Sequence, residues 1–185
     1  MSRTGNLTEG KIASTLFRFA IPVFFTLFLQ ALYGGVDLLI VGQFAETADV
    51  SGVATGSMLL STVTNVITGL SMGITILVGE RIGQKDRDGA GRAIGGGIFL
   101  FLLFGIFLTA VMLFGAEMLA KLLHAPEEAF TETVAYIRIC GGGSLFIVAY
   151  NVLGAIFRGI GDAKTPLITV LIACVVNIFG VLLLV

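Results

Sequence analysis

Long apolar runs separated by short polar connections dominate this sequence. Residues 19–36 contain no charged residue, and four further apolar runs follow along the chain. A helix needs about 20 apolar residues to cross a hydrocarbon core of roughly 30 Å, and each run reaches that length. The pattern therefore predicts five membrane-spanning helices, over residues 19–44, 50–78, 93–114, 133–157 and 166–185.

The composition supports the same fold class, an all-α bundle of membrane helices. Of the 185 residues, 56% are hydrophobic and 12% are charged, and the mean hydropathy is +1.02. Soluble domains carry about 25% charged residues. We therefore expect a multi-pass protein of the cell membrane that contacts the lipid bilayer. A net charge of −1 gives no reason to expect nucleic acid as a partner.

The distribution of basic residues predicts the orientation. Nine of the 11 Lys and Arg residues lie before the first span, after the second or after the fourth. The other two connections are rich in Glu and Asp. Because Lys and Arg accumulate on the cytoplasmic side, we expect a cytoplasmic amino terminus. The chain ends Leu-Leu-Leu-Val without an interfacial anchor, so we also expect a truncated chain.

One acid, Asp37, lies inside the first apolar run. Gln30, Tyr33 and Asp37 follow helical spacing and share one stripe. A carboxylate at the middle of a membrane helix costs about 2.5–3.5 kcal/mol on insertion scales, and less near its end. Asp37 either caps the external end of the helix or faces the bundle interior and binds a coupling ion. The second interpretation is preferred, because the apolar run continues for four residues beyond Asp37 and intramembrane acids mark ion pathways.

Three further spans carry polar residues at depth, whereas the third span is almost entirely apolar and is predicted to face lipid. These polar residues are Asn65 and Thr68 in the second span, Ser144 and Asn151 in the fourth, and Asn177 in the fifth. Each alone is explained by a hydrogen bond between helices, worth about 0.6 kcal/mol. Polar stripes on four helices together indicate a wet cavity, for which Gln30, Tyr33, Asn65, Thr68 and Asn151 are the predicted lining residues.

Glycines four residues apart suggest close helix packing, although the signal is weak in a chain with 25 glycines. Two such pairs are Gly52 with Gly56 and Gly69 with Gly73. Small residues at this spacing let two helix backbones approach each other.

Other chemistry finds little support. Cys140 and Cys174 lie in apolar runs without metal-ligand or disulfide spacing, and His124 has no second ligand nearby in sequence. Residues 158–164 resemble a phosphate-binding loop but lack its second glycine before the lysine, so we interpret them as a turn. We expect no enzyme activity, no metal and no cofactor.

Several landmarks together resemble the multidrug and toxic compound extrusion (MATE) transporters, from about Leu16 to the last residue. They are Gln30-Ala-Leu-Tyr33-Gly-Gly-Val-Asp37, Val41-Gly42, Gly69-Leu-Ser-Met-Gly73, Ile82-Gly83-Gln-Lys-Asp86, Arg158-Gly-Ile-Gly-Asp162-Ala-Lys-Thr-Pro166 and Val176-Asn177. The order and spacing of the set make the resemblance specific.

The resemblance implies five helices of a six-helix lobe, with residues 1–185 as an incomplete amino-terminal lobe and a second lobe as its partner. It implies antiport of cationic or amphipathic organic compounds against protons or sodium ions. Asp37 and Asn177 match residues implicated in cation coupling. Family members often have an acid four residues beyond the asparagine, where this chain has Val181. With one carboxylate instead of two, a proton on Asp37 or a coupling site in the absent lobe is favoured over sodium at this site.

Two alternatives remain open at this stage. One is a lipid or glycolipid flippase of the same wider superfamily, which would need a broader and more basic cavity. The other is a non-transporting membrane subunit that packs its helices against a partner.

Overall fold

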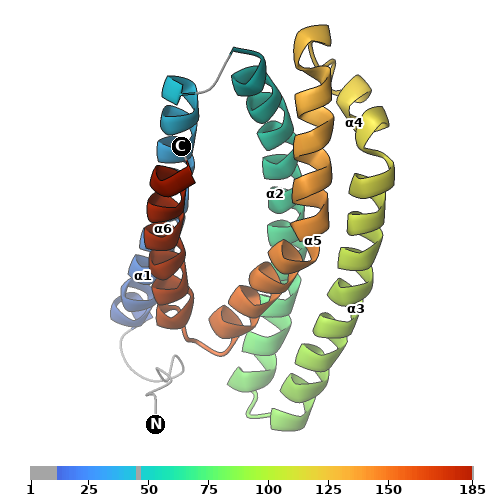
Figure 1. The fold of residues 1–185 in the computed structure, drawn as a ribbon. Helices are drawn as coiled ribbons and strands as arrows, with labels where there is room; N and C mark the ends of the chain where they lie inside the picture. Colours follow the sequence, from blue (N-terminus) through green and yellow to red (C-terminus); the bar gives the residue numbers. More distant parts are fainter. Residues whose placement is uncertain (1–11, 45–46, 185) are drawn as a thin grey trace. The chain divides into compact units, whose positions relative to one another are not determined.

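The computed structural model describes residues 12–44 and 47–184, in which every regular element is helical (Figure 1). The long helices are α1 (Ile12–Phe44), α2 (Thr47–Gly83), α3 (Arg87–Phe114), α5 (Phe130–Gly159) and α6 (Lys164–Leu184). Two short elements join α3 to α5, the helix α4 (Ala116–Leu122) and the 3₁₀ helix η1 (Glu127–Ala129).

The predicted helical fold class is confirmed, and each predicted span falls within one long helix apart from residue 185, which lies outside the described residues. Within the described residues, α1, α2, α3 and α5 are each long and apolar enough to cross a membrane. In α6 the apolar stretch covers Lys164–Gly180, which is shorter than in the other four. The sequence pattern does not predict α4 and η1, because their residues have the composition of a polar connection.

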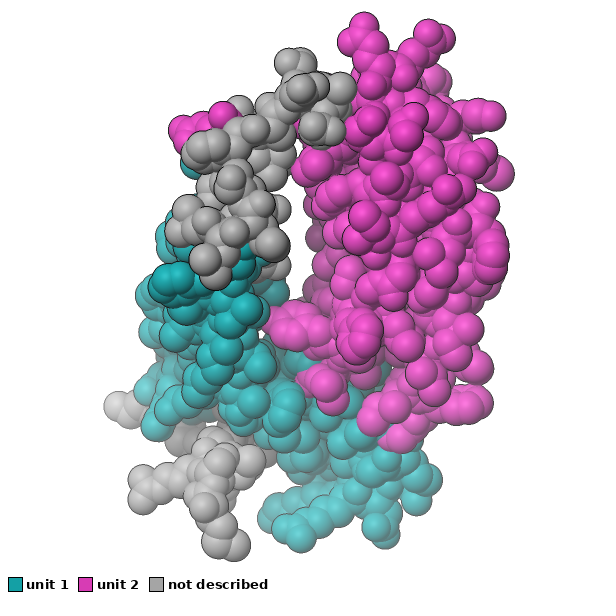
Figure 2. All heavy atoms as spheres, in the orientation of Figure 1, with its two compact units in different colours: residues 1–41, 74–94, 154–185 teal, residues 42–73, 95–153 magenta. Residues whose placement is uncertain are grey.

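The chain divides into two compact units (Figure 2). Unit 1 combines residues 1–41, 74–94 and 154–185, and so holds most of α1, the end of α2, the start of α3, the end of α5 and all of α6. Its buried side chains include Val78, Ala155, Val170 and Cys174. Cys174 is a free thiol enclosed by the packing of this unit.

Within unit 1, the ends of α2 and α5 pack closely. The hydroxyl of Thr75 on α2 donates a 2.9 Å hydrogen bond to the carbonyl oxygen of Ala155 on α5. A Cβ atom at Gly159 would lie 3.0 Å from Cβ of Val78. The glycine thus permits an approach that a larger residue would oppose.

Unit 2 combines residues 42–73 and 95–153, and contains a hydrophobic core around the α3, α4 and α5 region. Its buried members are Met112, Ala116, Ala120, Val134 and Ile137. Gly52 and Gly56 of α2 face α5, because a Cβ at Gly52 would lie 2.7 Å from Cβ of Glu132 and one at Gly56 would overlap the ring of Tyr136. The weak glycine signal therefore marks a real contact at this pair, whereas a Cβ at Gly69 or Gly73 would meet nothing within 4 Å.

Two connections in unit 1 share one local structure. Lys85 after α2 and Gly161 after α5 have left-handed backbone angles, with φ of 62° and 84°. The next residue in each case is an aspartate, whose N–H bonds back to Arg81 or Phe157 in the preceding helix.

The aspartate then caps the following helix. Asp86 accepts from the N–H of Gly89 at 2.8 Å, and Asp162 accepts from the N–H groups of Lys164 and Thr165 at 3.0 and 3.1 Å.

Candidate functional site

Asn177 of α6 carries the polar atom that most needs an explanation. Its Oδ1 is the one buried side-chain nitrogen or oxygen in the described part of the chain that has no hydrogen-bond partner. Leaving a buried acceptor unpaired costs about 1–3 kcal/mol, so such atoms are rare in native proteins, and a bound water or ion is one explanation for them. Asn177 is one of the two residues predicted to couple a cation.

The polar stripe of α1 is described only in part. Gln30 is half-buried on α1, within unit 1. The side chains of Tyr33 and Asp37 lie outside the described residues. The ion-coupling role of Asp37 therefore stays a prediction. The sequence adds one fact to it, because Asp37 is the sole acidic residue in the five predicted spans.

Two of the predicted cavity residues meet in unit 2. The hydroxyl of Thr68 on α2 lies 2.9 Å from Oδ1 of Asn151 on α5, and 2.8 Å from the carbonyl oxygen of Thr64. A hydroxyl has a single proton to donate, so these two acceptors share it. Nδ2 of Asn151 donates to the carbonyl oxygen of Ile147 at 2.8 Å, which fixes the orientation of the amide. The pair joins α2 to α5 and leaves acceptor capacity on Asn151.

The remaining polar residues of unit 2 divide into two groups. Asn65 is exposed on α2. Ser144, in contrast, is 1% exposed, and its hydroxyl lies 2.8 Å from that of Thr109 on α3. Its interpretation as part of a wet stripe is therefore wrong, because the helix contact fully encloses it. The sequence offers one indication of this contact, because Thr109 is the only hydroxyl in the third predicted span.

No metal site is found among the described residues, where no three His, Cys, Asp or Glu side chains cluster. His124 occupies a left-handed position, with φ of 53°, where its N–H bonds to the carbonyl oxygen of Lys121 and ends α4. Unit 1 thus holds the amides of Gln30 and Asn177, and unit 2 holds the hydrogen-bonded pair of Thr68 and Asn151. Neutral amides and hydroxyls of this kind can hydrogen-bond a polar ligand.

Comparison with known proteins identifies the family. The MatE family model matches residues 22–183, which is most of the chain. The chain belongs to the MatE family. MatE proteins are multi-pass membrane transporters and not enzymes, which agrees with the predicted location and class.

Curated relatives of this MatE chain have similar sequences but are much longer. The chain is 28% identical over 172 residues to the probable multidrug resistance protein YpnP of Bacillus subtilis, covering 93% of this chain and 39% of YpnP. It is 27% identical over 169 residues to the probable multidrug resistance protein NorM of Thermotoga maritima, covering 91% of this chain and 36% of NorM. The chain therefore spans less than two fifths of the length of these relatives.

Solved structures of transporters have the same fold. A MOP superfamily transporter from Pyrococcus furiosus matches with a TM-score of 0.88 and 25% identity, over 97% of this chain and 39% of that one. The crystal structure of a MATE protein in complex with MaD3S matches equally well, with a TM-score of 0.88, 25% identity, and coverage of 97% and 40%. The resemblance noted in the sequence is thus confirmed at the level of family and fold.

Proposed function

We propose that this chain is part of a multidrug efflux transporter that exchanges cationic or amphipathic organic compounds for protons or sodium ions. The proposal is supported by the family and by relatives named as multidrug resistance proteins. The structural observation that carries it is the buried, unpartnered Oδ1 of Asn177. An acceptor oxygen without a donor is suited to a cation or to a protonated group.

The coupling step follows from charge balance. Asp37 bears a negative charge in a segment that otherwise lacks ionised groups over residues 19–36. Binding a positive ion at Asp37 neutralises that charge and lowers the cost of enclosing it in an apolar bundle. Asn177 supplies a neutral oxygen to the same ion. A cationic substrate competes for the carboxylate, so ion and substrate occupy the site in turn.

Substrate binding is assigned to neutral polar residues. Gln30, Tyr33, Asn65, Thr68 and Asn151 offer hydrogen bonds without a fixed charge. A cavity of this kind recognises ligands by shape and by apolar contact, with a few polar groups for orientation. It is therefore compatible with several substrates of similar charge and size.

The coupling ion is proposed to be a proton. Val181 stands where a second acid would help to hold sodium, and one carboxylate suffices for a proton. The deciding experiment measures ethidium efflux from cells that express the gene containing this chain. Efflux is followed with sodium present, with sodium absent, and with the proton gradient collapsed.

The expected result is efflux that persists without sodium and stops when the proton gradient collapses. Loss of efflux on sodium removal alone would replace the proton with sodium and leave the transport proposal intact. Ethidium retention equal to that of cells with an empty vector in all three conditions, for a protein detected in the membrane, would overturn the transport proposal for this substrate class.

A further inference from the structure

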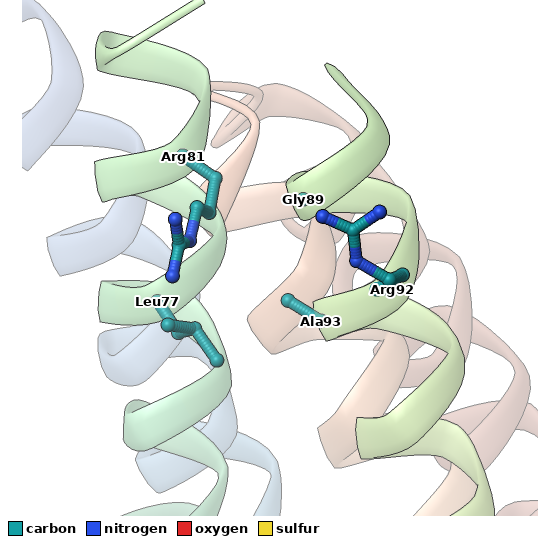
Figure 3. A pocket seen from close by; sticks show the side chains of 5 residues that line it. All are labelled: Leu77, Arg81, Gly89, Arg92 and Ala93. Carbon is teal, nitrogen blue, oxygen red and sulfur yellow. The ribbon is translucent and has the colours of Figure 1, made fainter. Parts of the chain in front are cut away.

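A hollow of about 290 Å³ lies between the end of α2 and the start of α3, within unit 1 (Figure 3). It is lined by Leu77 and Arg81 of α2 and by Gly89, Arg92 and Ala93 of α3. Two lining residues are cationic and none is acidic. In the sequence these two arginines indicate only the orientation of the chain, because nothing in their spacing shows that they line one hollow.

The geometry around Arg81 is fixed by Asp86. Nη1 of Arg81 lies 3.5 Å from Oδ2 of Asp86, whose other carboxylate oxygen caps α3 at the N–H of Gly89. A Cβ atom at Gly89 would lie 2.6 Å from Cγ of Asp86, so a side chain there would displace this carboxylate. The arrangement holds one edge of the guanidinium and leaves its other donors for a ligand.

Arg92 is the second cationic residue of the lining. It lies on α3 three residues after Gly89, and it forms no ion pair within the described residues. Two guanidinium groups on one hollow repel each other unless an anion lies between them. Arginine suits phosphate in particular, because its planar donors can bind two oxygens at once.

The position of the hollow along the helices indicates which source of phosphate lies within its reach. Arg81 lies in the last turn of α2 and Arg92 in the second turn of α3, where the apolar parts of both helices end. Leu77 on α2 lines the hollow beside the arginines and is itself exposed, and Ala93 on α3 adds a second apolar side chain to the lining. The hollow thus has a cationic end and an apolar end, at the level where a bilayer places its headgroups.

We propose that this hollow binds the headgroup of an anionic phospholipid, with the phosphate between Arg81 and Arg92. Leu77 and Ala93 contact the carbon atoms next to the phosphate. A zwitterionic lipid binds less well, because its own ammonium group opposes the two arginines. Inorganic phosphate binds less well, because it lacks the apolar part. The site depends only on the membrane location of the protein and does not rest on the transport proposal.

The test uses the full chain in neutral detergent micelles, with bound lipid counted by native mass spectrometry. Phosphatidylglycerol, phosphatidylcholine and inorganic phosphate are titrated separately at about 0.2 M salt, where charges beyond roughly 7 Å are screened. Phosphatidylglycerol is expected to bind most tightly. Arg92→Gln is expected to lower its affinity about tenfold, the amount expected for loss of a charge-assisted hydrogen bond.

Two further variants separate the site from general charge. Arg87→Gln removes an equal charge from an exposed residue outside the lining, and should change affinity by less than about twofold. Ala93→Leu fills the hollow without changing any charge, and should weaken phosphatidylglycerol binding as Arg92→Gln does. Circular dichroism confirms that each variant keeps its helix content, which is expected for Arg92→Gln because that side chain has no ion pair to lose.

Three results would overturn the proposal. Phosphatidylcholine could bind as tightly as phosphatidylglycerol, which would remove the role of the two cations. Inorganic phosphate could match the lipid, which would make the hollow a site for free phosphate. Arg87→Gln could weaken binding as much as Arg92→Gln, which would leave only diffuse electrostatic attraction.

Discussion

At the scale of single residues, the buried hydroxyl of Ser144 and the buried amide oxygen of Asn177 differ in what surrounds them. Ser144 has the hydroxyl of Thr109 and the carbonyl oxygen of Gly141, each at 2.8 Å. Asn177 Oδ1 has no partner within the described residues. The first arrangement stabilises a helix contact, and the second costs stability unless something else binds there.

Replacing Asn177 tests whether its unpaired oxygen costs stability and serves ion coupling. Asn177→Leu removes the unpaired acceptor, so the free energy of unfolding should stay unchanged or rise by about 1 kcal/mol. Ethidium efflux should nevertheless fall to the level of the empty vector, because the ion loses a ligand. Thermal unfolding in detergent and efflux in cells measure the two effects. Normal efflux in the Asn177→Leu variant would refute the coupling role.

Ser144→Ala provides the matched comparison at a satisfied position. Loss of the Ser144 hydroxyl should lower the free energy of unfolding by about 0.6 kcal/mol, because its contact with Thr109 is lost. Efflux per folded molecule should not change. A double-mutant cycle with Thr109→Val measures the coupling between the two hydroxyls, and no coupling would contradict the hydrogen bond.

The stability that Asp162 contributes should depend on pH. Burial alone would raise the pKa of this carboxyl group, but hydrogen bonds from Thr165 and Lys164 and the charge of Lys164 outweigh it and lower the pKa. Its contribution to stability is therefore complete above the ordinary value of 3.8 and is lost as pH falls through the lowered value. Asp162→Ala should cost about 1 kcal/mol at pH 7, since the cap of α6 is lost.

The pH profile of unfolding tests this prediction. The difference between the native protein and Asp162→Ala should shrink as the pH falls below about 4. Asp162→Asn keeps an amide cap, so it should retain most of the stability at pH 7 and lose the pH dependence. A constant difference at every pH would show that the carboxylate charge does not contribute.

At the scale of helices, α2 and α5 form close contacts inside each unit. In unit 1 the contact involves Thr75, Ala155 and Gly159, and in unit 2 it involves Gly52 and Gly56. α1 differs from both, because most of the large apolar side chains that the structure describes on it are exposed, with Phe17 at 68% and Phe24 at 65%. Exposed apolar side chains on a membrane helix are suited to lipid or to further helices.

The helix contact in unit 2 can be tested by adding one methyl group. Gly56→Ala places a Cβ 2.9 Å from Cγ of Tyr136 and should lower the free energy of unfolding by about 1 kcal/mol or more. Gly69→Ala on the same helix meets nothing within 4 Å and should be neutral or stabilising by up to about 1 kcal/mol, because alanine favours helix. Equal effects of both substitutions on thermal unfolding would contradict the packing described.

At the scale of the whole molecule, the distribution of basic residues makes a prediction about topology. In a background with Cys140→Ala and Cys174→Ala, the variants Gln84→Cys and Glu128→Cys place a thiol in two exposed connections. A thiol reagent that cannot cross membranes should label Glu128→Cys in intact cells. It should label Gln84→Cys only after the cells are opened, because the positive-inside rule places that connection in the cytoplasm. The reverse pattern would invert the predicted orientation.

The sequence by itself determined the membrane class and the position of the long helices. The hydrocarbon core imposes a minimum length on each span, so apolar runs such as residues 19–36 are visible without any tertiary information. Asp37 was visible for the same reason, since one acid stands out in an apolar run. The turn around Asp162 is visible in the sequence, but its helix cap is not. The local sequence does not show from which N–H groups the carboxylate accepts hydrogen bonds.

Only the tertiary structure decided which faces of the helices meet. Membrane helices are apolar on most sides, so the helical periodicity that marks the buried face of a soluble protein is largely absent. For this reason the sequence treated Gly52 and Gly56 like Gly69 and Gly73, and placed Ser144 in a wet stripe. The pairing of Ser144 with Thr109 and the lack of a partner for Asn177 depend on neighbours far away in sequence, and so became visible only in the packed helices.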